Sequence, residues 1–536
     1  MWPLFFLWDA SLISVFLHTL TVILIFILTI NIIKYITPDL HIPIRDTSKQ
    51  HNWRNGKLLS KTCYCSVCEA LMVTGRGVYC DCCGVCADRG CIKVADRKIK
   101  CKAITSSDKG PMKHHWVKGN LPIGACCYVC EEECGSEYGL VDWFCCWCQR
   151  TVHSRCRVHL EEVCDFGPYR NQLIPPSCVV LTKKRSSVRR KLQLRSVKSP
   201  GWENWTPIIV LANCKSGNND GNMILSLFRR LLNPAQVLDL GEQPPEAALE
   251  WCSLLGNVRA TVLVAGGDGT IGWVLNSVNN LQLKPNPGVA ILPIGTGNDL
   301  SRILGWGKAH CPDSDPGVVL QQVQNAHLVQ LDRWKIEVHP YRHLGIRLPV
   351  RNMFMYNYLS VGVDAQVTLD FHRARASPFY IISSRLINKM LYLTYGTQQV
   401  MERGFRDLEQ RLELYLDGVR ANLPSIESVV VLNIPSWGAG VHLWSMGAAG
   451  SEDVAPQSYS DGKLEVVALY SSFHIAQLQV GLSQPHRVGQ ASCVQIKLKD
   501  RIPVQVDGEP WEQHPAELNI TFHNQATVLK CAEVGE

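Results

Sequence analysis

Thr261-Val-Leu-Val-Ala-Gly-Gly-Asp-Gly-Thr270 is the segment of this chain that is most informative about its architecture. Its first five residues are typical of a buried strand, and they run directly into a glycine-rich loop. Residues 207–212 precede the loop 213–217 in the same way, and residues 288–292 precede Pro293-Ile-Gly-Thr-Gly-Asn-Asp299. Helical stretches separate these strands, and this alternation predicts a parallel α/β sheet. Ligands of such a sheet bind at the carboxyl ends of its strands.

The three glycine-rich loops suit phosphate binding. Glycine lets backbone N–H groups approach phosphate oxygens closely, and the N-terminus of a following helix adds a favourable dipole. The sequence has no G-x-x-x-x-G-K-[ST] motif, so it does not encode a P-loop enzyme. Asp268 lies among small residues at a strand end, where an aspartate can simply cap a turn or helix. The two companion loops favour a catalytic role instead.

Gly266-Gly-Asp-Gly-Thr270 and residues 293–299 together resemble the catalytic domain of diacylglycerol kinases and, more distantly, sphingosine, ceramide and NAD kinases. The resemblance implies that, with Mg²⁺, the chain transfers the γ-phosphoryl group of ATP to diacylglycerol and forms phosphatidic acid. It also implies a catalytic domain over residues 205–340, with Asp268 in a catalytic role. The ATP-binding residues that it implies are Asn213, Lys215, Ser216, Gly217, Gly266, Gly267, Asp268, Gly269, Thr270, Gly295, Thr296, Gly297 and Asn298.

Residues 341–531 resemble the accessory domain of the same family. Short apolar runs predict strands in a mainly β lobe, at residues 429–432, 464–469, 494–498 and 518–522. Resemblance to bacterial lipid kinases of this fold implies that Glu509 is the general base, that Asp507 is its neighbour and that Asp461 helps to hold magnesium. Asp-Gly is also a strong turn signal, so a plain hairpin is the alternative interpretation of Asp507 and Glu509.

Cysteine is concentrated in one region, because 18 of the 24 cysteines lie between Cys63 and Cys164. Paired C-x2-C spacing interleaved with histidine favours zinc over disulfides. The second module, finger 2 (residues 114–164), resembles the diacylglycerol-binding, phorbol-ester type of zinc finger. In that family the ligands interleave, which implies two structural zinc sites. One would use His114, Cys145, Cys148 and Cys164, and the other Cys127, Cys130, His153 and Cys156.

The first module, finger 1 (residues 51–101), is a looser copy of the same pattern. Asp88 stands where the pattern has histidine, and a carboxylate can also bind zinc. Cys86 leaves a second register open, because Cys83-x2-Cys86 is another possible pair. The spacing of both fingers does not suit a helix in a DNA major groove, so we expect no nucleic-acid partner. The expected ligands are His51, Cys65, Cys68, Cys80, Cys83, Asp88, Cys91 and Cys101.

The N-terminus predicts a membrane anchor. Residues 10–33 contain no Asp, Glu, Lys or Arg and are long enough to cross a hydrocarbon core as a helix. A signal peptide would need a basic start and a small-residue cleavage site, and neither is present. Basic residues follow the segment, which predicts a single-pass protein of the endoplasmic reticulum or plasma membrane with its catalytic part in the cytoplasm.

Residues 175–204 form a basic linker, with eight Lys or Arg and no acidic residue between Lys183 and Lys198. We expect a solvated, disordered segment that can also lie on an anionic membrane surface. The order of anchor, two fingers, catalytic and accessory domains most resembles the epsilon type of the family, which is associated with arachidonoyl-containing lipid. The alternatives are a sphingosine or ceramide kinase, which the fingers argue against, and a silent membrane adapter, which intact phosphate loops argue against.

Overall fold

A computed structural model describes most of the 536-residue chain. No helix within the described residues is both long and apolar enough to cross a membrane. Most of the predicted anchor at residues 10–33 lies outside them. The described residues are 21–22, 25, 43–44, 50–55, 63–72, 77–106, 110–185, 190–214, 220–295, 297–311, 314–341, 349–376, 407–447 and 455–532.

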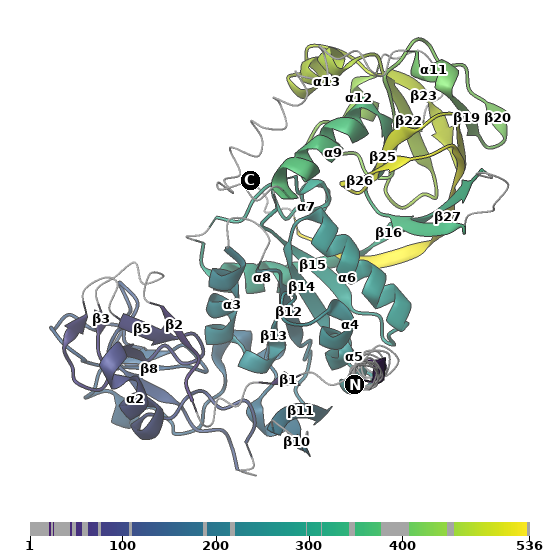
Figure 1. Ribbon diagram of the computed structural model, residues 1–536. Helices are drawn as coiled ribbons and strands as arrows, with labels where there is room; N and C mark the ends of the chain where they lie inside the picture. Colours follow the sequence, from purple (N-terminus) through teal and green to yellow (C-terminus); the bar gives the residue numbers. More distant parts are fainter. Residues whose placement is uncertain are drawn as a thin grey trace, which may run out of the picture.

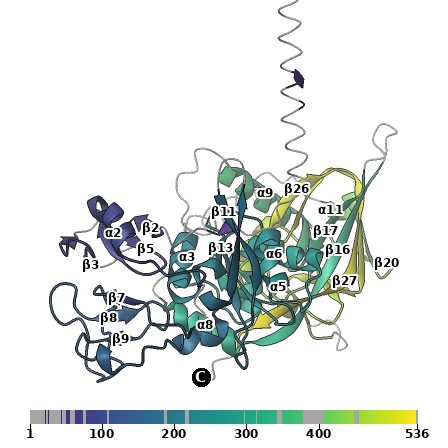
Figure 2. The same cartoon turned by 90° about the horizontal axis from the view of Figure 1, so that it is seen from below.

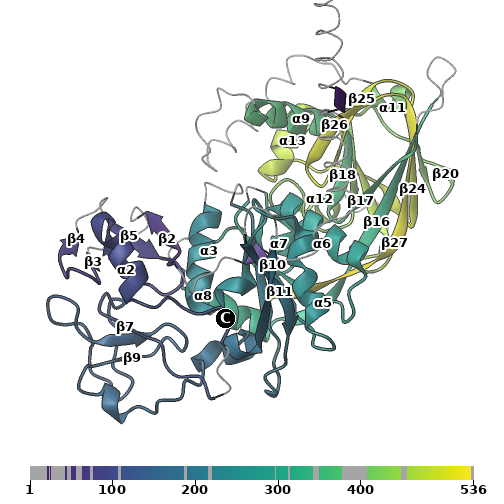
Figure 3. The same ribbon diagram turned by 60° about the horizontal axis from the view of Figure 1, so that its bottom comes forward.

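Four parallel strands form the catalytic sheet, in the order β13, β12, β14, β15. Alternate residues of these strands pack into two separate cores, one on each face. Helices α3 and α8 cover one face, and α4, α5 and α6 cover the other (Figures 1 and 3). The predicted parallel α/β domain is confirmed. The strands are β12 (Ile208–Ala212), β13 (Val237–Asp239), β14 (Thr261–Gly266) and β15 (Gly288–Pro293).

The helices of this domain follow the strands closely along the chain. Two of these helices, α4 and α5, are short and meet at Leu249. Their bounds are α3 (Asp220–Leu231), α4 (Pro245–Ala248), α5 (Glu250–Leu254), α6 (Asp268–Leu281), α7 (Asp299–Ile303) and α8 (Pro316–Asn325).

The catalytic sheet continues into the accessory lobe instead of ending at β15. β27 pairs in parallel with β15 through Val289 and Val528, and it pairs antiparallel with β16 along its whole length. Figure 2 shows β16 and β27 side by side. A single mixed sheet therefore joins the two lobes. The added strands are β16 (His327–Pro340), β17 (Arg351–Met355), β19 (Leu412–Leu416), β20 (Val419–Arg420), β24 (Cys493–Leu498) and β27 (Ala516–Lys530).

A second, antiparallel sheet packs on this extension through a shared apolar core that contains Trp334, Val431 and Ile496. The predicted mainly β lobe is thus confirmed. Its strands are β18 (Tyr358–Gly362), β21 (Ser428–Leu432), β22 (Leu464–Leu469), β23 (His486–Ala491), β25 (Ile502–Val506) and β26 (Glu509–Gln513). Its helices are α9 (Val363–Ala376), α11 (Leu408–Arg411), α12 (Leu443–Met446) and α13 (Ser472–Gln479).

The two fingers form a small cysteine-rich unit beside α3 (Figure 1). Finger 1 contains β2 (Trp53–Asn55), β3 (Cys63–Tyr64), β4 (Leu71–Met72), β5 (Gly77–Cys80), β6 (Cys86–Asp88), a 3₁₀ turn at Arg89–Cys91 and α2 (Ile92–Lys98). Finger 2 contains β7 (Trp116–Lys118), β8 (Trp143–Cys145), β9 (Thr151–Val152) and a 3₁₀ turn at Arg157–His159.

The segment expected to be a disordered linker contains two paired strands, which corrects that expectation. β10 (Val179–Arg185) and β11 (Arg190–Val197) pair antiparallel, and β1 (Pro43–Ile44) pairs with β11. Val179 and Leu194 are buried in the core of the catalytic domain. Apolar residues spaced along the basic run explain why the segment packs instead of remaining solvated. Further 3₁₀ turns lie at Gly167–Gln172, Pro176–Cys178 and Pro234–Gln236.

Candidate active site and metal clusters

Two of the glycine-rich loops touch each other at the carboxyl ends of β14 and β15. A Cβ atom on Gly295 would lie 2.5 Å from the Cα of Gly267, a distance that real side chains do not adopt. The backbones approach so closely only because both residues lack a side chain. Helices α6 and α7 follow these two loops directly. The first N–H groups of a helix have no partner within the helix, so the start of α6 can receive an anion.

Asp268 is the first residue of α6 and lies between these loops. Its Oδ2 accepts a 2.9 Å hydrogen bond from the backbone N–H of Asp299. Its Oδ1 is buried and has no hydrogen-bond partner in the described part of the chain. Burial and, next, the neighbouring Asp299 carboxylate raise the pKa of Asp268 to about 7. Such a displaced pKa in a phosphate-binding loop is typical of a functional carboxyl group.

Asp299 holds a loop of the accessory lobe against the catalytic domain. Its carboxylate accepts hydrogen bonds from the Ser436 hydroxyl and, at 3.2 Å, from the backbone N–H of Ala439. Sequence analysis did not propose Asp299 as a site residue, although it ends the quoted 293–299 motif. The loop at residues 436–440 was missed entirely, because its partner lies more than 130 residues away in the sequence.

Glu509 lies beside Asp268, although the two residues come from different lobes. An added Cβ on Gly269 would lie 3.6 Å from Glu509 Oε1, which places this carboxylate at the first turn of α6. Glu509 is exposed, as a group that must reach a substrate has to be. The structure therefore places Glu509, which the resemblance gives as the general base, at the first turn of the helix that begins with Asp268.

Asp507 and Gly508 form the turn of the β25–β26 hairpin, with left-handed φ angles of 48° and 85°. The hairpin alternative was therefore right about the local structure. The Asp507 carboxylate accepts three backbone hydrogen bonds of 2.8 to 3.0 Å, from Tyr356, Asn357 and Tyr358. Burial raises its pKa to about 6. Because both oxygens are occupied, Asp507 positions the hairpin that carries Glu509.

The other predicted nucleotide-binding residues are described only in part. The Asn213 amide donates to Thr270 Oγ1 at 3.2 Å, which joins the first two loops. The Asn298 amide donates to the carbonyls of Gly295 and Lys308, so it shapes the third loop. Gly266 and Gly297 also lie in these loops. Lys215, Ser216, Gly217 and Thr296 lie outside the described residues.

Asp461 lies in a different acidic neighbourhood from Asp268. Its charge acts on buried Asp332 and Glu465, whose pKa values are raised mainly by burial. Its own Oδ1 accepts a 3.1 Å hydrogen bond from the N–H of Lys463. None of the clusters of three or more metal-ligating side chains found among the described residues contains Asp461. Its magnesium role stays a prediction.

Three clusters of the cysteine-rich unit have the ligand set of a structural zinc site. Each holds three thiol groups and one imidazole whose ligand atoms lie within 4.8 Å of one another. Both interleaved sets expected in finger 2 are present, and in finger 1 Cys83 joins Cys80 and not Cys86. These clusters are compatible with zinc. They are His51, Cys80, Cys83 and Cys101; His114, Cys145, Cys148 and Cys164; and Cys127, Cys130, His153 and Cys156.

The fourth cluster contains Cys65, Cys68 and Cys91 but not Asp88, which corrects the expected ligand set. The Asp88 carboxylate instead accepts a 2.8 Å hydrogen bond from the N–H of Gly90 and caps the following 3₁₀ turn. An aspartate is well suited to this capping geometry, and the cap competes with metal binding. Three thiols alone leave one tetrahedral position without a protein ligand.

A polar network behind α6 was also missed by sequence analysis. Arg333 is fully buried, stacks on Phe354 and donates to Asn276 Oδ1 from both Nε and Nη2. Tyr356 donates to the same oxygen at 3.1 Å. The network links α6 to the β17–β18 turn that Asp507 holds. The Asp332-Arg-Trp334 motif was visible in the sequence, but nothing local indicated its partners.

The site combines glycine-rich loops at strand ends with the half-buried Asp268 and with the exposed Glu509 of the β lobe. This combination is typical of a two-lobed phosphotransferase. Family models agree: residues 207–334 match the diacylglycerol kinase catalytic domain, and residues 354–510 match the accessory domain. The chain belongs to the diacylglycerol kinase family, whose members are ATP-dependent lipid kinases that phosphorylate diacylglycerol.

Curated relatives extend this similarity beyond the two domains. Diacylglycerol kinase 2 of Arabidopsis thaliana is 31% identical over 589 aligned residues, covering 87% of this chain and 82% of that protein. Probable diacylglycerol kinase 3 of Caenorhabditis elegans is 32% identical, and the alignment covers 90% of this chain and 64% of that protein. Diacylglycerol kinase iota of Homo sapiens is 32% identical, and the alignment covers 90% of this chain and 50% of that protein. This chain therefore spans half the length of that relative.

Solved structures give a weaker likeness. A diacylglycerol kinase from Bacillus anthracis str. Sterne covers 61% of this chain and 97% of its own, with a TM-score of 0.36 and 16% identity. The structure of yeast NADH kinase complexed with NADH covers 66% of this chain and 90% of its own, with a TM-score of 0.35 and 13% identity.

Proposed function

We propose that Asp268 and Glu509 are the catalytic carboxylates of this diacylglycerol kinase. The observation that carries the proposal is the position of Glu509 Oε1 at Gly269, the residue that follows Asp268. Phosphoryl transfer depends mainly on alignment and on stabilising developing charge, so the site needs few chemical groups. Glu509 is exposed and accepts the proton of the diacylglycerol hydroxyl as the bond to phosphorus forms.

Asp268 orients the phosphate side of the reaction. Its Oδ2 is fixed by the N–H of Asp299, so Oδ1 remains as a buried acceptor with a defined direction. A free carboxylate oxygen is the ligand type that Mg²⁺ prefers, and bound Mg²⁺ would neutralise charge on the phosphates. Backbone N–H groups at the start of α6 receive the triphosphate oxygens.

We further propose that the three complete Cys3His clusters hold structural zinc. Small modules of this kind gain most of their folding free energy from metal, on the order of 10 kcal/mol per site. The thiols stay reduced and metal-bound in the cytoplasm, where we also place the catalytic domain. The apolar segment at residues 10–33 would anchor the chain in the membrane that holds diacylglycerol, and the basic residues 183–198 would contact anionic lipid.

The order of these parts supports an epsilon-type enzyme. An apolar N-terminal segment, two fingers and the kinase domains follow one another without a calcium-binding EF-hand loop or an ankyrin repeat in the sequence. A preference for arachidonoyl-containing diacylglycerol belongs to this proposal. It is tested by competing arachidonoyl and saturated diacylglycerols in one assay.

Mixed micelles that offer diacylglycerol, ceramide and sphingosine together with labelled ATP test the function itself. We expect labelled phosphatidic acid from the wild-type chain and none from Asp268→Asn or Glu509→Gln. Glu517→Gln is the matched control, because Glu517 pairs with Gln495 on the accessory sheet, away from the proposed catalytic pair. Labelled ceramide phosphate or sphingosine phosphate as the main product, or full activity in both site variants, would contradict the proposal.

A further inference from the structure

Finger 1 is attached to the catalytic domain through a buried carboxylate. Asp81 follows the cluster residue Cys80 and is completely buried. Its Oδ2 accepts 3.0 Å hydrogen bonds from Arg54 of finger 1 and from Arg229 of α3. Its Oδ1 accepts a 2.6 Å bond from the Asn52 amide. A carboxylate removed from water and held by two guanidinium groups fixes the spacing between the elements that carry them.

A second buried charge holds the end of the same helix. Lys102 follows the cluster residue Cys101 and is also completely buried. Its Nζ donates to the carbonyl of Arg230 at 2.7 Å and to that of Arg229 at 3.4 Å. These carbonyls lie in the last turn of α3, where no backbone N–H groups remain to satisfy them. The ammonium group also complements the negative end of the helix dipole.

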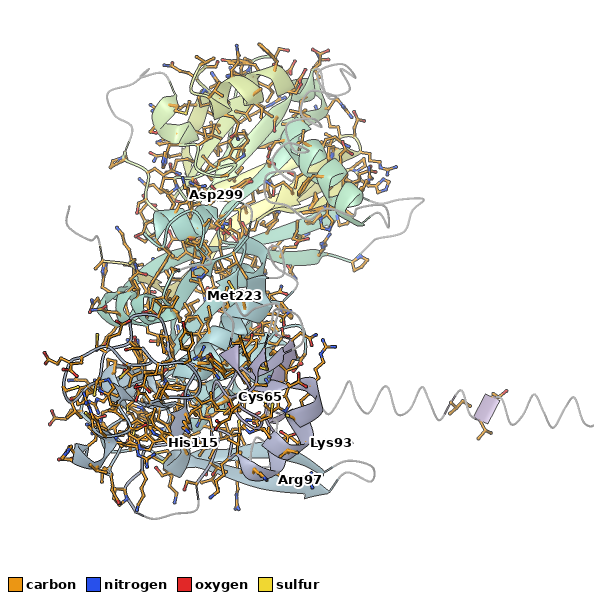
Figure 4. All side chains as sticks on the ribbon, turned by 90° about the vertical axis from the view of Figure 1, so that its left-hand side faces the viewer. Cys65, Lys93, Arg97, His115, Met223 and Asp299 are labelled. Atoms are coloured by element: carbon orange, nitrogen blue, oxygen red, sulfur yellow. The ribbon has the colours of Figure 1, made fainter. Side chains whose placement is uncertain are left out.

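The opposite end of α3 lies against the first glycine-rich loop. A Cβ on Gly221 would be 2.6 Å from the carbonyl oxygen of Asn213 and 2.8 Å from the Cα of Cys214, so the first turn of α3 touches the loop backbone. The Cys214 thiol also approaches Asn222 Oδ1 at 3.4 Å. Figure 4 shows Met223 of α3 between Cys65 of finger 1 and Asp299 of the site.

We infer that the His51, Cys80, Cys83 and Cys101 cluster, when it holds zinc, positions Asn213 and Cys214, the first two residues after β12, through α3. Two of its four ligands are each followed directly by a residue that binds α3, Asp81 and Lys102. Metal binding fixes Cys80 and Cys101 relative to each other, and thereby fixes both attachments. Finger 1 then contributes to the geometry of the ATP site. The inference rests on the assignment of residues 213–217 to nucleotide binding.

Steady-state kinetics on the full chain test the coupling. Asp81→Asn keeps the shape of the side chain and removes its charge, and Arg229→Gln breaks the same ion pair from α3. We expect each variant to raise the KM for ATP about tenfold, with the KM for diacylglycerol unchanged. The double variant should be no worse than the single variants, because they remove one shared interaction. Asp165→Asn is the control, since Asp165 directly follows finger 2 and pairs with Arg150 of that finger and not with α3.

Two further measurements separate positioning from a general loss of folded protein. Zinc content should equal that of the wild type, and amide exchange should increase in α3 without increasing in the strands of the accessory lobe. A lowered kcat with an unchanged KM for ATP, or unchanged exchange in α3 of Arg229→Gln, would overturn the inference. If Asp81→Asn does not fold, the KM for ATP and the amide exchange of Arg229→Gln alone test the inference.

The test also distinguishes this inference from the proposed function. Binding of a magnesium–ATP analogue can be titrated without any lipid. If the wild-type chain made no phosphatidic acid, the proposed function would fail. Weaker analogue binding in Arg229→Gln would still support the coupling, whereas equal binding by the wild type and Arg229→Gln would refute it.

Discussion

The backbone N–H of Asp299 donates a 2.9 Å hydrogen bond to the Oδ2 atom of Asp268, and this bond joins the loops that follow β14 and β15. Because Asp299 also binds Ser436 and Ala439, the contact transmits the position of the accessory lobe to the proposed catalytic aspartate. The geometry of the site therefore depends on both lobes at once.

Replacing Asp268 with asparagine should abolish activity and increase stability at alkaline pH. The raised pKa of about 7 means that the folded protein keeps a proton that the unfolded chain loses near pH 4. Wild-type stability should therefore fall between about pH 4 and 7, by on the order of 4 kcal/mol, and stay low above pH 7. Asp268→Asn has no such ionisation, so its Tm relative to the wild type should rise from pH 5 to pH 8. Equal Tm differences at both values would contradict this assignment.

Replacing Glu509 with glutamine should lower kcat about 100-fold or more while leaving the KM for ATP nearly unchanged. The Glu509 side chain is exposed, and its carboxylate is the part that lies near Gly269. The substitution should therefore leave the stability of the folded protein unchanged. Initial rates on diacylglycerol micelles provide the measurement. A large rise in the KM for ATP would show that Glu509 binds nucleotide instead of acting on the acceptor hydroxyl.

A methyl group at Gly295 should separate the two phosphate loops. The added Cβ would lie 2.5 Å from the Cα of Gly267, and backbone cannot move aside as a flexible side chain does. Gly295→Ala should therefore weaken binding of a magnesium–ATP analogue more than tenfold, as measured by titration calorimetry. Gly272→Ala is the control. Its Cβ would meet only Tyr356 at 3.9 Å, so we expect equal or slightly higher stability.

Removing the charge of Asp507 should destabilise the hairpin that carries Glu509. Its carboxylate accepts three backbone N–H groups, and an amide oxygen cannot satisfy all three. We expect Asp507→Asn to cost about 2 kcal/mol of stability and to lower kcat, because Glu509 loses its fixed position. Thermal unfolding and initial rates measure the two effects. A large loss of kcat without any loss of stability would indicate that Asp507 takes part in the chemistry itself.

Completing the incomplete cluster of finger 1 should slow the release of zinc. Cys65, Cys68 and Cys91 lack a fourth protein ligand, since Asp88 caps a turn. A coloured zinc chelator should remove about one ion per chain rapidly from the wild type. Asp88→His should abolish that rapid phase by adding an imidazole. Asp88→Asn preserves the cap without adding a zinc ligand of comparable strength, so its rapid phase of zinc release should remain. Equal rates of zinc release in all three proteins would contradict the prediction that this cluster lacks a fourth ligand.

Much of this architecture could be predicted from the sequence because its causes are local. Runs of apolar residues identify the strands of the catalytic sheet. Ligand spacing indicates the zinc ligands of finger 2, and the resemblance to the phorbol-ester type of finger implies how they divide into two interleaved clusters. Ligand spacing failed at Asp88, where a carboxylate can cap a turn as well as bind metal, and only the backbone conformation decides between them.

Long-range contacts account for most of the features that were missed. Residues 523–527 are largely polar, so the apolar pattern predicted a strand that ends at residue 522. β27 nevertheless continues to Lys530, because β16 supplies hydrogen-bond partners along its whole length. The attachment of Asp81 to Arg229 likewise spans 148 positions and leaves no periodic signature in either segment.

The position of β27 has a consequence for synthesis on the ribosome. The strand that pairs with the outer edge of β15 is β27, near the end of the chain at Val528. A nascent chain that has emerged only as far as β16 therefore leaves the outer edge of β15 unpaired. At about 5–20 residues per second, roughly 10–40 seconds pass before that neighbour arrives. During this interval the edge of β15 is open to pairing with a strand of another chain.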